Sequence, residues 1–380
     1  MIKVFKYRLY PTKKQAGFLV FQLEGHRYLY NQALAQRKEL YQQTGKGIGY
    51  SLQATALLPK LRKENEQLAF CNYSSLQQTL RRLDKAFKAF FARIKSGEKA
   101  GPPRFKSAER FNTISYATPG DGCQIKENRL YLQNVGCIKV KWHRSIKGKV
   151  KTLSITRRNG KWYVSFAVEC DPEPLPKIGK EVGIDLGLKA FVATSDGQQI
   201  EAPKYLRKSE KKLVKAQKRL SRRQKGSSRR RKAGVLLAKK HEEVANQRLD
   251  FCHKVAYCLV KAYDGFAVET LKVKAMVQNK YLSKSISDAS WGMFLLILKG
   301  KAESAGRWYR EVPSNGTSQR CSGCGEIVKK SLAVRTHNCP HCGLVLDRDQ
   351  NAALNILKRA WTGPSALASK FEVSPRSCRL

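Results

Sequence analysis

The spacing of apolar residues predicts a strand followed by helices in the first hundred residues of this chain. Residues 2–9 alternate loosely between apolar and polar positions, as the residues of a half-buried strand do. Thr12 and Gln15 have the form of a capping box, in which hydroxyl and amide side chains satisfy backbone donors at a helix start. The predicted helices run from this box to about residue 43, over 51–68 with an interruption at Pro59, and from a cap at Ser74 or Ser75 to Gly97.

The pattern changes to short alternating runs between residues 112 and 170, which predicts strands. The predicted strands cover residues 124–132, 137–142, 152–156 and 162–168. Asn159 and Gly160 lie between the last two, and they predict a tight hairpin because both residues tolerate positive φ. The proline-rich segment 171–176 follows, and we take it as the main domain boundary.

Strands and helices alternate beyond this boundary. The predicted strands are a β-meander formed by 181–187, 190–194 and a short strand after the turn at 195–197, and two later strands at 266–269 and 308–312. The predicted helices are two long ones within 203–263, split at 225–232, one at 286–305, and one that opens at 347–353 and ends near Trp361. Residues 362–380 lack periodicity, and we expect a disordered tail there.

The charge of the chain indicates its partners. Its 380 residues carry 74 Lys and Arg against 29 Asp and Glu, a formal net charge of +45 at pH 7. Such an excess repels itself unless a polyanion neutralises it, and nucleic acid is the commonest polyanion. The hydrophobic fraction of 42% is ordinary, so wholesale disorder is excluded. No run approaches the roughly 18 apolar residues of a membrane span, and no signal peptide is recognisable, so we expect a soluble, cytoplasmic protein.

Four of the eleven cysteines form two knuckles, Cys321 with Cys324 and Cys339 with Cys342, separated by 14 residues. This spacing predicts a zinc ribbon, because each knuckle places two sulfurs on one tight turn and four thiolates close a tetrahedron. A closed tetrahedron leaves no position for water, so the zinc would be structural. His337 and His341 lie close enough in sequence to be considered as ligands, but four cysteines suffice.

Three acids in apolar surroundings need an explanation in so basic a chain. Asp185 lies within a predicted strand, Glu269 ends another, and Asp349 lies at the start of the last helix. These positions would converge at one edge of a ribonuclease-H-like sheet and hold two divalent ions about 4 Å apart, and carboxylate oxygens suit Mg²⁺. Each acid alone could instead cap a helix or join an ion pair. Asp347 competes with Asp349 for the third role, and we favour Asp349 because it is nearer the helix.

The segment 207–232 is the most basic of the chain, with fourteen Lys and Arg against one Glu. A solvated helical face is the usual reason for a run of charges. The imbalance here favours contact with phosphate, which would position a duplex without reading its sequence. The candidate contacts are Arg229, Arg230, Arg231 and Lys232.

Seven motifs follow one another in an order that resembles one known family. They are Lys6–Gln15, Gly101–Lys106, Gly183–Gly187, Val268-Glu269, Thr317–Gly325, Cys339–Gly343 and Asp347–Ala353. The chain resembles TnpB from Lys6 to about Ile356. TnpB is the family of RNA-guided DNA endonucleases that insertion sequences encode, related to compact type V CRISPR effectors. The resemblance implies that Asp185, Glu269 and Asp349 are the catalytic carboxylates of a RuvC-type nuclease.

The resemblance also implies a multidomain α/β fold. Its expected parts are a β-barrel-like wedge domain at 1–10 and 108–171, a helical recognition domain at 11–107, a RuvC domain at 172–316 and 346–361, an inserted zinc ribbon at 317–345, and the tail at 362–380. The expected cofactors are two catalytic Mg²⁺ ions and one structural Zn²⁺.

The function that the resemblance implies is Mg²⁺-dependent cleavage of DNA beside a short flanking motif, in association with transposition. The partners would be a guide RNA derived from the transposon end and double-stranded target DNA, in a prokaryotic cytoplasm, with the protein on the nucleoid when DNA is bound. Two alternatives stay open: an RNA-guided DNA-binding regulator without nuclease activity, and a transposase that transfers strands itself. The intact set of acids argues against the first, and we identify no tyrosine nucleophile for the second.

Overall fold

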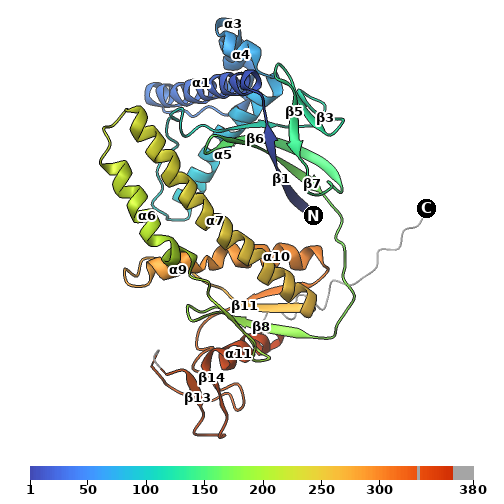
Figure 1. The fold of residues 1–380 in the computed structure, drawn as a ribbon, viewed down its shortest axis with the longest axis vertical. Coiled ribbons are helices and arrows are strands. Elements are labelled where there is room, and N and C mark those ends of the chain that lie inside the picture. The colour runs from blue at the N-terminus through green and yellow to red at the C-terminus, as the bar shows by residue number, and fades with distance from the viewer. Residues whose placement is uncertain (332–333, 363–380) are drawn as a thin grey trace, which may run out of the picture. The chain divides into compact units, whose positions relative to one another are not determined.

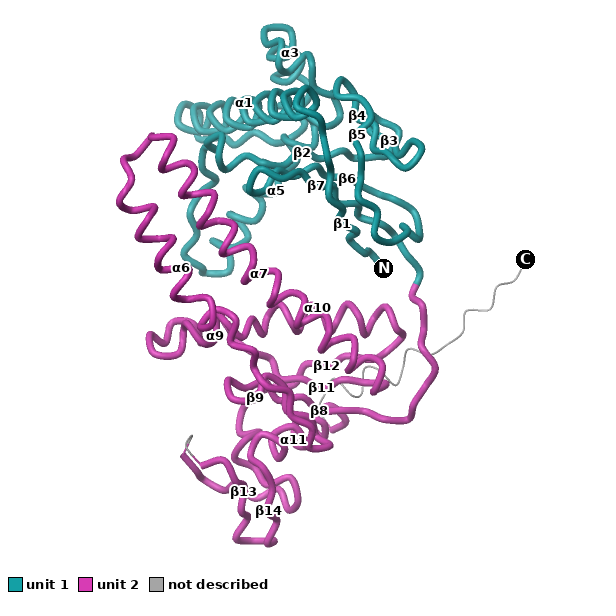
Figure 2. Tube along the Cα trace, in the orientation of Figure 1, with its two compact units in different colours: residues 1–171 teal, residues 172–380 magenta. Residues whose placement is uncertain are grey.

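The computed structural model describes residues 1–331 and 334–362 of the chain. The chain divides into two compact units, Met1–Asp171 (unit 1) and Pro172–Leu380 (unit 2), drawn in different colours in Figure 2. No helix among the described residues is long and apolar enough to cross a membrane. The predicted tail lies outside the described residues except for Thr362, which ends the last helix.

Unit 1 contains a seven-stranded antiparallel sheet (Figure 1). Its strands are β1 (Ile2–Tyr10), β2 (Thr113–Tyr116), β3 (Cys123–Lys126), β4 (Arg129–Leu132), β5 (Gly136–Lys141), β6 (Lys149–Arg158) and β7 (Lys161–Glu169), in the order β2-β6-β7-β1-β5-β4-β3. β1 lies inside the sheet because it pairs with β7 and with β5. Its alternate residues Phe5, Tyr7 and Leu9 are buried in the core, as the period-2 pattern predicted.

Two hairpins of this sheet test the sequence predictions. Asn159 and Gly160 have φ of 50° and 73° and form the predicted tight turn between β6 and β7. The prediction of one strand over 124–132 is wrong, because β3 and β4 are joined by a turn at Glu127 and Asn128. Their φ values are 41° and 65°, and a left-handed conformation is more easily reached by Asn than by most residues. The turn therefore forms without glycine.

The helices of unit 1 pack with this sheet around one hydrophobic core. They are α1 (Lys13–Thr44), α2 (Tyr50–Leu52), the π-helical turn η1 (Gln53–Leu57), α3 (Leu58–Glu64), α4 (Glu66–Phe70) and α5 (Tyr73–Lys95). The predicted capping box is confirmed. The Gln15 N–H donates to Thr12 Oγ1 over 3.3 Å, and the Thr12 N–H donates to Gln15 Oε1 over 3.0 Å.

Two predicted helix boundaries in unit 1 are wrong. Pro59 does not end its helix, because residues 50–64 are helical throughout. The π-helical turn η1 directly precedes α3, so the missing N–H of Pro59 falls where the α-helical hydrogen-bond pattern already changes. The break falls at Asn65, whose extended backbone caps α4. α5 is capped by Asn72, which accepts from the Ser75 N–H at 2.8 Å, and not by Ser74 or Ser75.

Unit 2 is built on a five-stranded mixed sheet. Its strands are β8 (Glu181–Asp185), β9 (Ala190–Thr194), β10 (Gln199–Glu201), β11 (Gly265–Glu269) and β12 (Trp308–Val312), in the order β10-β9-β8-β11-β12. The first three form the predicted antiparallel meander, and β11 runs parallel to both β8 and β12. The inner strands β8, β9 and β11 are almost wholly buried, which explains their near-continuous apolar sequence.

Helices cover both faces of this sheet. They are α6 (Tyr205–Ser221), α7 (Ser228–Ala262), α8 (Val273–Met276), α9 (Ser283–Ala289), α10 (Trp291–Ser304) and α11 (Arg348–Thr362), and a short hairpin of β13 (Thr336–Asn338) and β14 (Val345–Asp347) precedes the last one. Figure 1 shows α7 and α10 on one side of β8 and β11, and α11 on the other.

Two predicted boundaries in unit 2 also differ from the structure. The helix predicted at 286–305 breaks at Ser290, whose φ of 58° separates α9 from α10. The split predicted at 225–232 is shorter. Because Ser227 caps α7, the basic residues 229–232 belong to its first helical turns.

Candidate active site and metal centre

Asp185 and Glu269 are the last residues of two neighbouring parallel strands. Ile184 of β8 pairs with Val268 of β11, so the next residue of each strand leaves the sheet at the same edge. Parallel strands present their carboxyl ends together, which brings residues 84 positions apart in the chain side by side. The predicted convergence of these two acids therefore follows from the strand register.

Helix α11 brings the third acid, Asp349, to the same edge. Gly183 lets the helix approach β8, because a Cβ on this residue would lie only 2.0 Å from the carbonyl oxygen of Ala353. Gly187 leaves room on the other side of Asp185, where a Cβ would meet the Ala190 carbonyl oxygen at 2.8 Å. The two glycines around Asp185 thus permit the close packing that gathers the acids.

The electrostatics of this edge follow from its crowding. Burial, followed by the negative charges of Glu269 and Asp349, raises the pKa of Asp185 to about 7, although the Leu186 N–H opposes the shift. Burial also raises the pKa of Glu269, against the hydrogen bond from Thr317 and the positive charge of Arg359. A buried group of carboxylates of this kind is what a cation site requires.

Asp347 and Asp349 have different surroundings. Asp347 Oδ1 accepts from the N–H groups of Asp349 at 2.8 Å and Gln350 at 3.2 Å, so Asp347 caps the helix. Asp349 is 9% exposed and contributes to the pKa shift of Asp185. Two guanidinium groups lie near it, Arg335 at 3.6 Å and Arg348 at 3.4 Å. The geometry favours Asp349 over Asp347 as the third member of the set.

The four predicted cysteines meet within unit 2. Their sulfur atoms all lie within 4.8 Å of one another. Among the described residues, this is the one group of at least three potential metal ligands that lie so close together. The Sγ atoms of Cys321 and Cys342 are 3.6 Å apart, as are those of Cys324 and Cys339. Disulfide bonds are about 2.05 Å long, whereas a zinc tetrahedron with Zn–S of about 2.3 Å separates its sulfurs by about 3.8 Å. The donor set therefore fits Zn²⁺.

The two histidines near the knuckles are not part of this cluster. His337 is buried, and its Nδ1 is paired with the Lys330 ammonium group. His341 is exposed. Glycines shape the two turns: Gly325 and Gly343 have φ of 87° and 71°.

Asparagines on α11 fasten the first knuckle to the active-site helix. Asn351 and Asn355 both donate to the Arg320 carbonyl oxygen, at 2.8 and 2.6 Å, and the Ser322 N–H donates to Asn351 Oδ1 at 2.9 Å. Sequence reasoning missed both residues. The available signal was two amides four positions apart on the apolar face of a helix, where an amide needs a partner.

The predicted phosphate contacts at the start of α7 are not equivalent. Arg230 is half-buried, and its Nη1 donates to the carbonyl oxygens of Leu220 at 3.1 Å and Arg223 at 2.7 Å, so it ties α7 to the end of α6. Arg229, Arg231 and Lys232 are exposed. A hollow of 310 Å³ is lined mainly by cations, namely Arg219, Arg223, Arg229 and Lys232. Three of the four candidates are thus free to face solvent.

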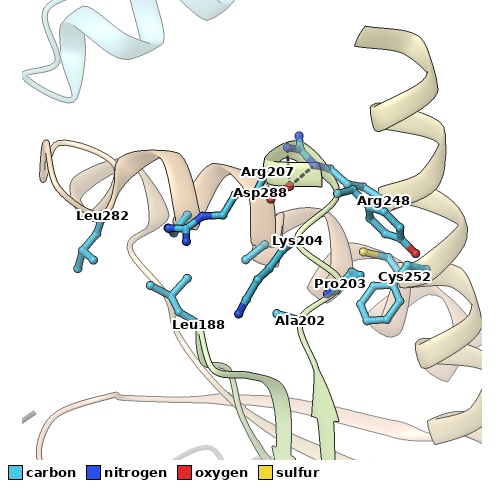
Figure 3. A pocket seen from close by; sticks show the side chains of 13 residues that line it. Leu188, Ala202, Pro203, Lys204, Arg207, Arg248, Cys252, Leu282 and Asp288 are labelled. Carbon is cyan, nitrogen blue, oxygen red and sulfur yellow. Dashed lines mark hydrogen bonds and ion pairs between the residues drawn. The ribbon is translucent and has the colours of Figure 1, made fainter. Parts of the chain in front are cut away.

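A cavity of 270 Å³ lies elsewhere in unit 2, between the end of β10, α7 and α9 (Figure 3). Asp288 accepts from Arg248 at 2.7 Å and from the Leu206 N–H at 3.0 Å. Much of the remaining lining is apolar, including Leu188, Phe251 and Leu282. The cavity contains none of the three acids. Asp288 is paired with Arg248, and Lys204 and Arg207 are further cations of the lining.

Three family models match the chain. One described as "Probable transposase" (OrfB_IS605) covers residues 165–280, one described as "Cas12f1-like, TNB domain" covers 291–356, and one described as "Helix-turn-helix domain" covers 1–46. The first contains Asp185 and Glu269, and the second contains the four cysteines and Asp349. Residues 1–46 form one strand and one helix in this structure, β1 and α1.

Relatives match nearly the whole chain. A "Putative RNA-guided DNA endonuclease" of Streptomyces pristinaespiralis is 34% identical over 369 residues, covering 93% of this chain and 88% of the relative. "Putative RNA-guided DNA endonuclease InsQ" of Escherichia coli (strain K12) is 29% identical over 374 residues, covering 94% of this chain and 92% of the relative. A solved structure, "Structure of the mini-RNA-guided endonuclease CRISPR-Cas_phi3", matches with a TM-score of 0.50 at 10% identity, over 95% of this chain and 92% of that one, which shows a likeness of fold.

These matches agree with the order of motifs along the sequence. The "Probable transposase" model spans the first two acids, and the first relative is similar across both units. The resemblance predicted from seven short motifs is therefore confirmed: this chain belongs to the TnpB family of insertion-sequence proteins.

Proposed function

We propose that this chain is an RNA-guided endonuclease that cuts DNA with Asp185, Glu269 and Asp349. The observation that carries the proposal is the meeting of these three acids at one edge of the unit 2 sheet. Relatives of the chain bear the name RNA-guided DNA endonuclease. An antiparallel meander followed by two parallel strands is the order of a ribonuclease-H-like sheet, and it supports a RuvC-type nuclease domain at 172–316 and 346–361.

The three carboxylates would hold two Mg²⁺ ions. Hard oxygen ligands suit this ion. The pKa of Asp185 is raised first by burial and then by the negative charges of Glu269 and Asp349, a repulsion that divalent cations would relieve. When bound, the ions would activate water and stabilise the leaving 3′ oxygen. The chain's own part is to keep the three acids together, which the packing of α11 on Gly183 supports, and to balance their charge with Arg335 and Arg348 before cations arrive.

The four cysteines would hold one structural Zn²⁺ in a ribbon at 317–345. Each thiolate is supplied by a knuckle rather than by a regular element, so the ion would replace the missing hydrophobic core of this segment. Asn351 and Asn355 join the first knuckle to α11. Zinc would therefore keep the ribbon docked beside Asp349.

The positive charge would neutralise a guide RNA derived from the transposon end and double-stranded target DNA. In such complexes base pairing supplies sequence specificity, and the protein reads only a short flanking motif. We assign the wedge domain to residues 1–10 and 108–171 and the recognition domain to 11–107, because unit 1 combines a sheet and a helical bundle in these segments. Arg229, Arg231 and Lys232 are the proposed phosphate contacts in unit 2.

A cleavage assay with purified ribonucleoprotein tests the proposal. The chain is co-expressed with the DNA that flanks its own gene, and the co-purified RNA is sequenced. Targets that match segments of this RNA are then offered next to a randomised flanking sequence in Mg²⁺. Cleavage that depends on complementarity to the RNA supports the proposal. Complementarity-dependent binding without cleavage would indicate a regulator, and joined DNA products would indicate strand transfer.

A further inference from the structure

Thr317 connects the segment before the first knuckle to Glu269. β12 ends at Val312, which pairs with Glu269, and the chain then turns back through residues 313–316. Thr317 is only 2% exposed, and its hydroxyl forms a hydrogen bond with Glu269 Oε1. The residue therefore reaches the carboxylate from a segment that does not belong to the sheet.

The direction of this hydrogen bond follows from the available donors. A threonine hydroxyl has one proton to donate. The Oγ1 atom of Thr317 has two acceptors in reach, Glu269 Oε1 and the Ser314 carbonyl oxygen at 3.2 Å. A hydrogen bond to an ionised carboxylate is roughly twice as strong as one to a neutral acceptor. The hydroxyl therefore donates to Glu269, and holding Oε1 restricts rotation of the carboxylate plane.

Helix α11 holds Thr317 in place through its backbone. Asn355 donates to the Thr317 carbonyl oxygen at 2.9 Å. Arg359, one turn further along the helix, donates to the carbonyl oxygens of Pro313 at 2.7 Å and Asn315 at 2.6 Å. The same helix carries Asp349 in its first turn. Helix α11 thus carries Asp349 itself and is connected to Glu269 through Thr317.

We propose that Thr317 is a positioning residue, which orients the Glu269 carboxylate for a divalent cation and couples it to α11 and the cysteine cluster. The inference rests on the proposed function, since it assigns Glu269 to a cation site. Arg320 and Ser322 of the first knuckle are bonded to the same helix. Thr317 lies between Glu269 and this knuckle along the chain.

Two substitutions separate this role from a structural one. Thr317→Val keeps the shape of the side chain and removes the donor, whereas Thr317→Ser keeps the hydroxyl. Loss of a hydrogen-bonding partner behind a metal ligand commonly weakens metal affinity or activity by about 10- to 100-fold. We expect that loss for T317V and near wild-type behaviour for T317S.

The experiment uses the full chain with its RNA and has two independent readouts. Binding of Mn²⁺, followed by electron paramagnetic resonance, measures the cation site without cleavage, and the Mg²⁺ dependence of the cleavage rate measures its use. Zinc content, and the melting temperature without added Mg²⁺ or Mn²⁺, are recorded for each protein. Weaker Mn²⁺ binding by T317V, with zinc and melting temperature unchanged and with rescue in T317S, supports the proposal.

Other results contradict it in distinguishable ways. If T317V binds Mn²⁺ as tightly as wild type and cuts with the same Mg²⁺ dependence, Thr317 does not position Glu269. A T317V protein that loses zinc or melts at a lower temperature assigns the hydrogen bond to folding and overturns the inference. If the wild-type complex binds Mn²⁺ but does not cut matched DNA, the proposed function fails, while the Mn²⁺ comparison still decides the role of Thr317.

Discussion

Gly183 of β8 and Ala353 of α11 approach so closely that a Cβ on Gly183 would lie 2.0 Å from the Ala353 carbonyl oxygen. This contact sets the distance between the strand that ends in Asp185 and the helix that begins beside Asp349. We predict that Gly183→Ala lowers the free energy of unfolding of unit 2 by about 1–3 kcal/mol or more, because the backbone of α11 must move away. Denaturant titration measures the loss.

The control for this prediction is Gly300→Ala in α10. A Cβ at Gly300 meets nothing within 4 Å, and alanine is the better helix former, so this variant should be equal to wild type or slightly more stable. Equal stabilities of the G183A and G300A proteins would show that the close approach has no energetic weight.

The crowded acids should make the cation-free protein less stable as pH rises. The pKa of Asp185 is raised from its ordinary value of 3.8 to about 7, so between these pH values the folded chain binds more protons than the unfolded chain. Stability therefore falls across this window and stays low above it. Asp185→Asn removes the penalty, and we predict a gain of roughly 2–4 kcal/mol at pH 8 without added Mg²⁺ that disappears near pH 4.

Unfolding titrations at the two pH values check this expectation. Asp250→Asn is the matched control, because Asp250 lies on the exposed face of α7 and pairs with Lys254 at 2.7 Å. A D185N protein no more stable than wild type at pH 8 would mean that neither burial nor the neighbouring carboxylates penalise the charged form of Asp185. Adding Mg²⁺ should increase the free energy of unfolding of the wild-type protein more than that of the Asp185→Asn variant.

Loss of zinc should unfold the cysteine ribbon rather than alter the acidic site directly. Cys321→Ser or Cys339→Ser leaves three thiolates, and we predict that one zinc per chain is lost and that the ribbon unfolds. The unit 2 core should persist, because its buried side chains come from other elements. Cys258→Ser, at an exposed position of α7, should retain the zinc. Full activity in a zinc-free preparation would refute the assignment.

Neutralising exposed cations at the start of α7 should weaken nucleic-acid binding. We predict that replacing Arg229, Arg231 and Lys232 together by Ala reduces the slope of log K against log salt by about 0.7–0.9 for each phosphate that the protein no longer neutralises. Sequence preference should survive, since phosphate contacts carry no base information. Binding titrations at several salt concentrations give the slope.

Arg230→Ala is the internal comparison for this triple variant. Because Arg230 donates to the carbonyl oxygens of Leu220 in α6 and of Arg223 just after it, its removal should lower the stability of the α6–α7 pair and leave the salt slope nearly unchanged. An unchanged slope in the triple variant would mean that the segment is a solvated surface.

Local patterns predicted much of the fold. The alternation of β1, the capping box at Thr12 and the hairpin at Asn159 are each decided by neighbouring residues, and all three are confirmed. The errors arose where a residue permits more than one structure. Pro59 is tolerated where α3 continues from a π-helical turn, and Asn128 forms a turn that glycine usually signals.

For the candidate active site, too, some features could be predicted from the sequence and others could not. The order of acidic motifs predicted that Asp185, Glu269 and Asp349 would meet, and the strand register and α11 bring them together. The partners of the second acid could not be predicted. Thr317 lies 48 residues from Glu269 in the sequence, and its backbone is held near Glu269 by a hydrogen bond from Asn355. A contact of this kind produces no periodic pattern in the sequence.

The most direct test of the claim that the three acids cut DNA is a cleavage assay with the purified ribonucleoprotein of the Asp185→Ala variant. The negative charges of both other acids act on Asp185. If the three acids hold the cations together, removing Asp185 should abolish cleavage of a matched target in Mg²⁺. Binding of RNA and target DNA should persist, because the proposed phosphate contacts lie elsewhere. Intact binding without cleavage is the predicted result, and cleavage by the Ala variant at a substantial rate would contradict the account.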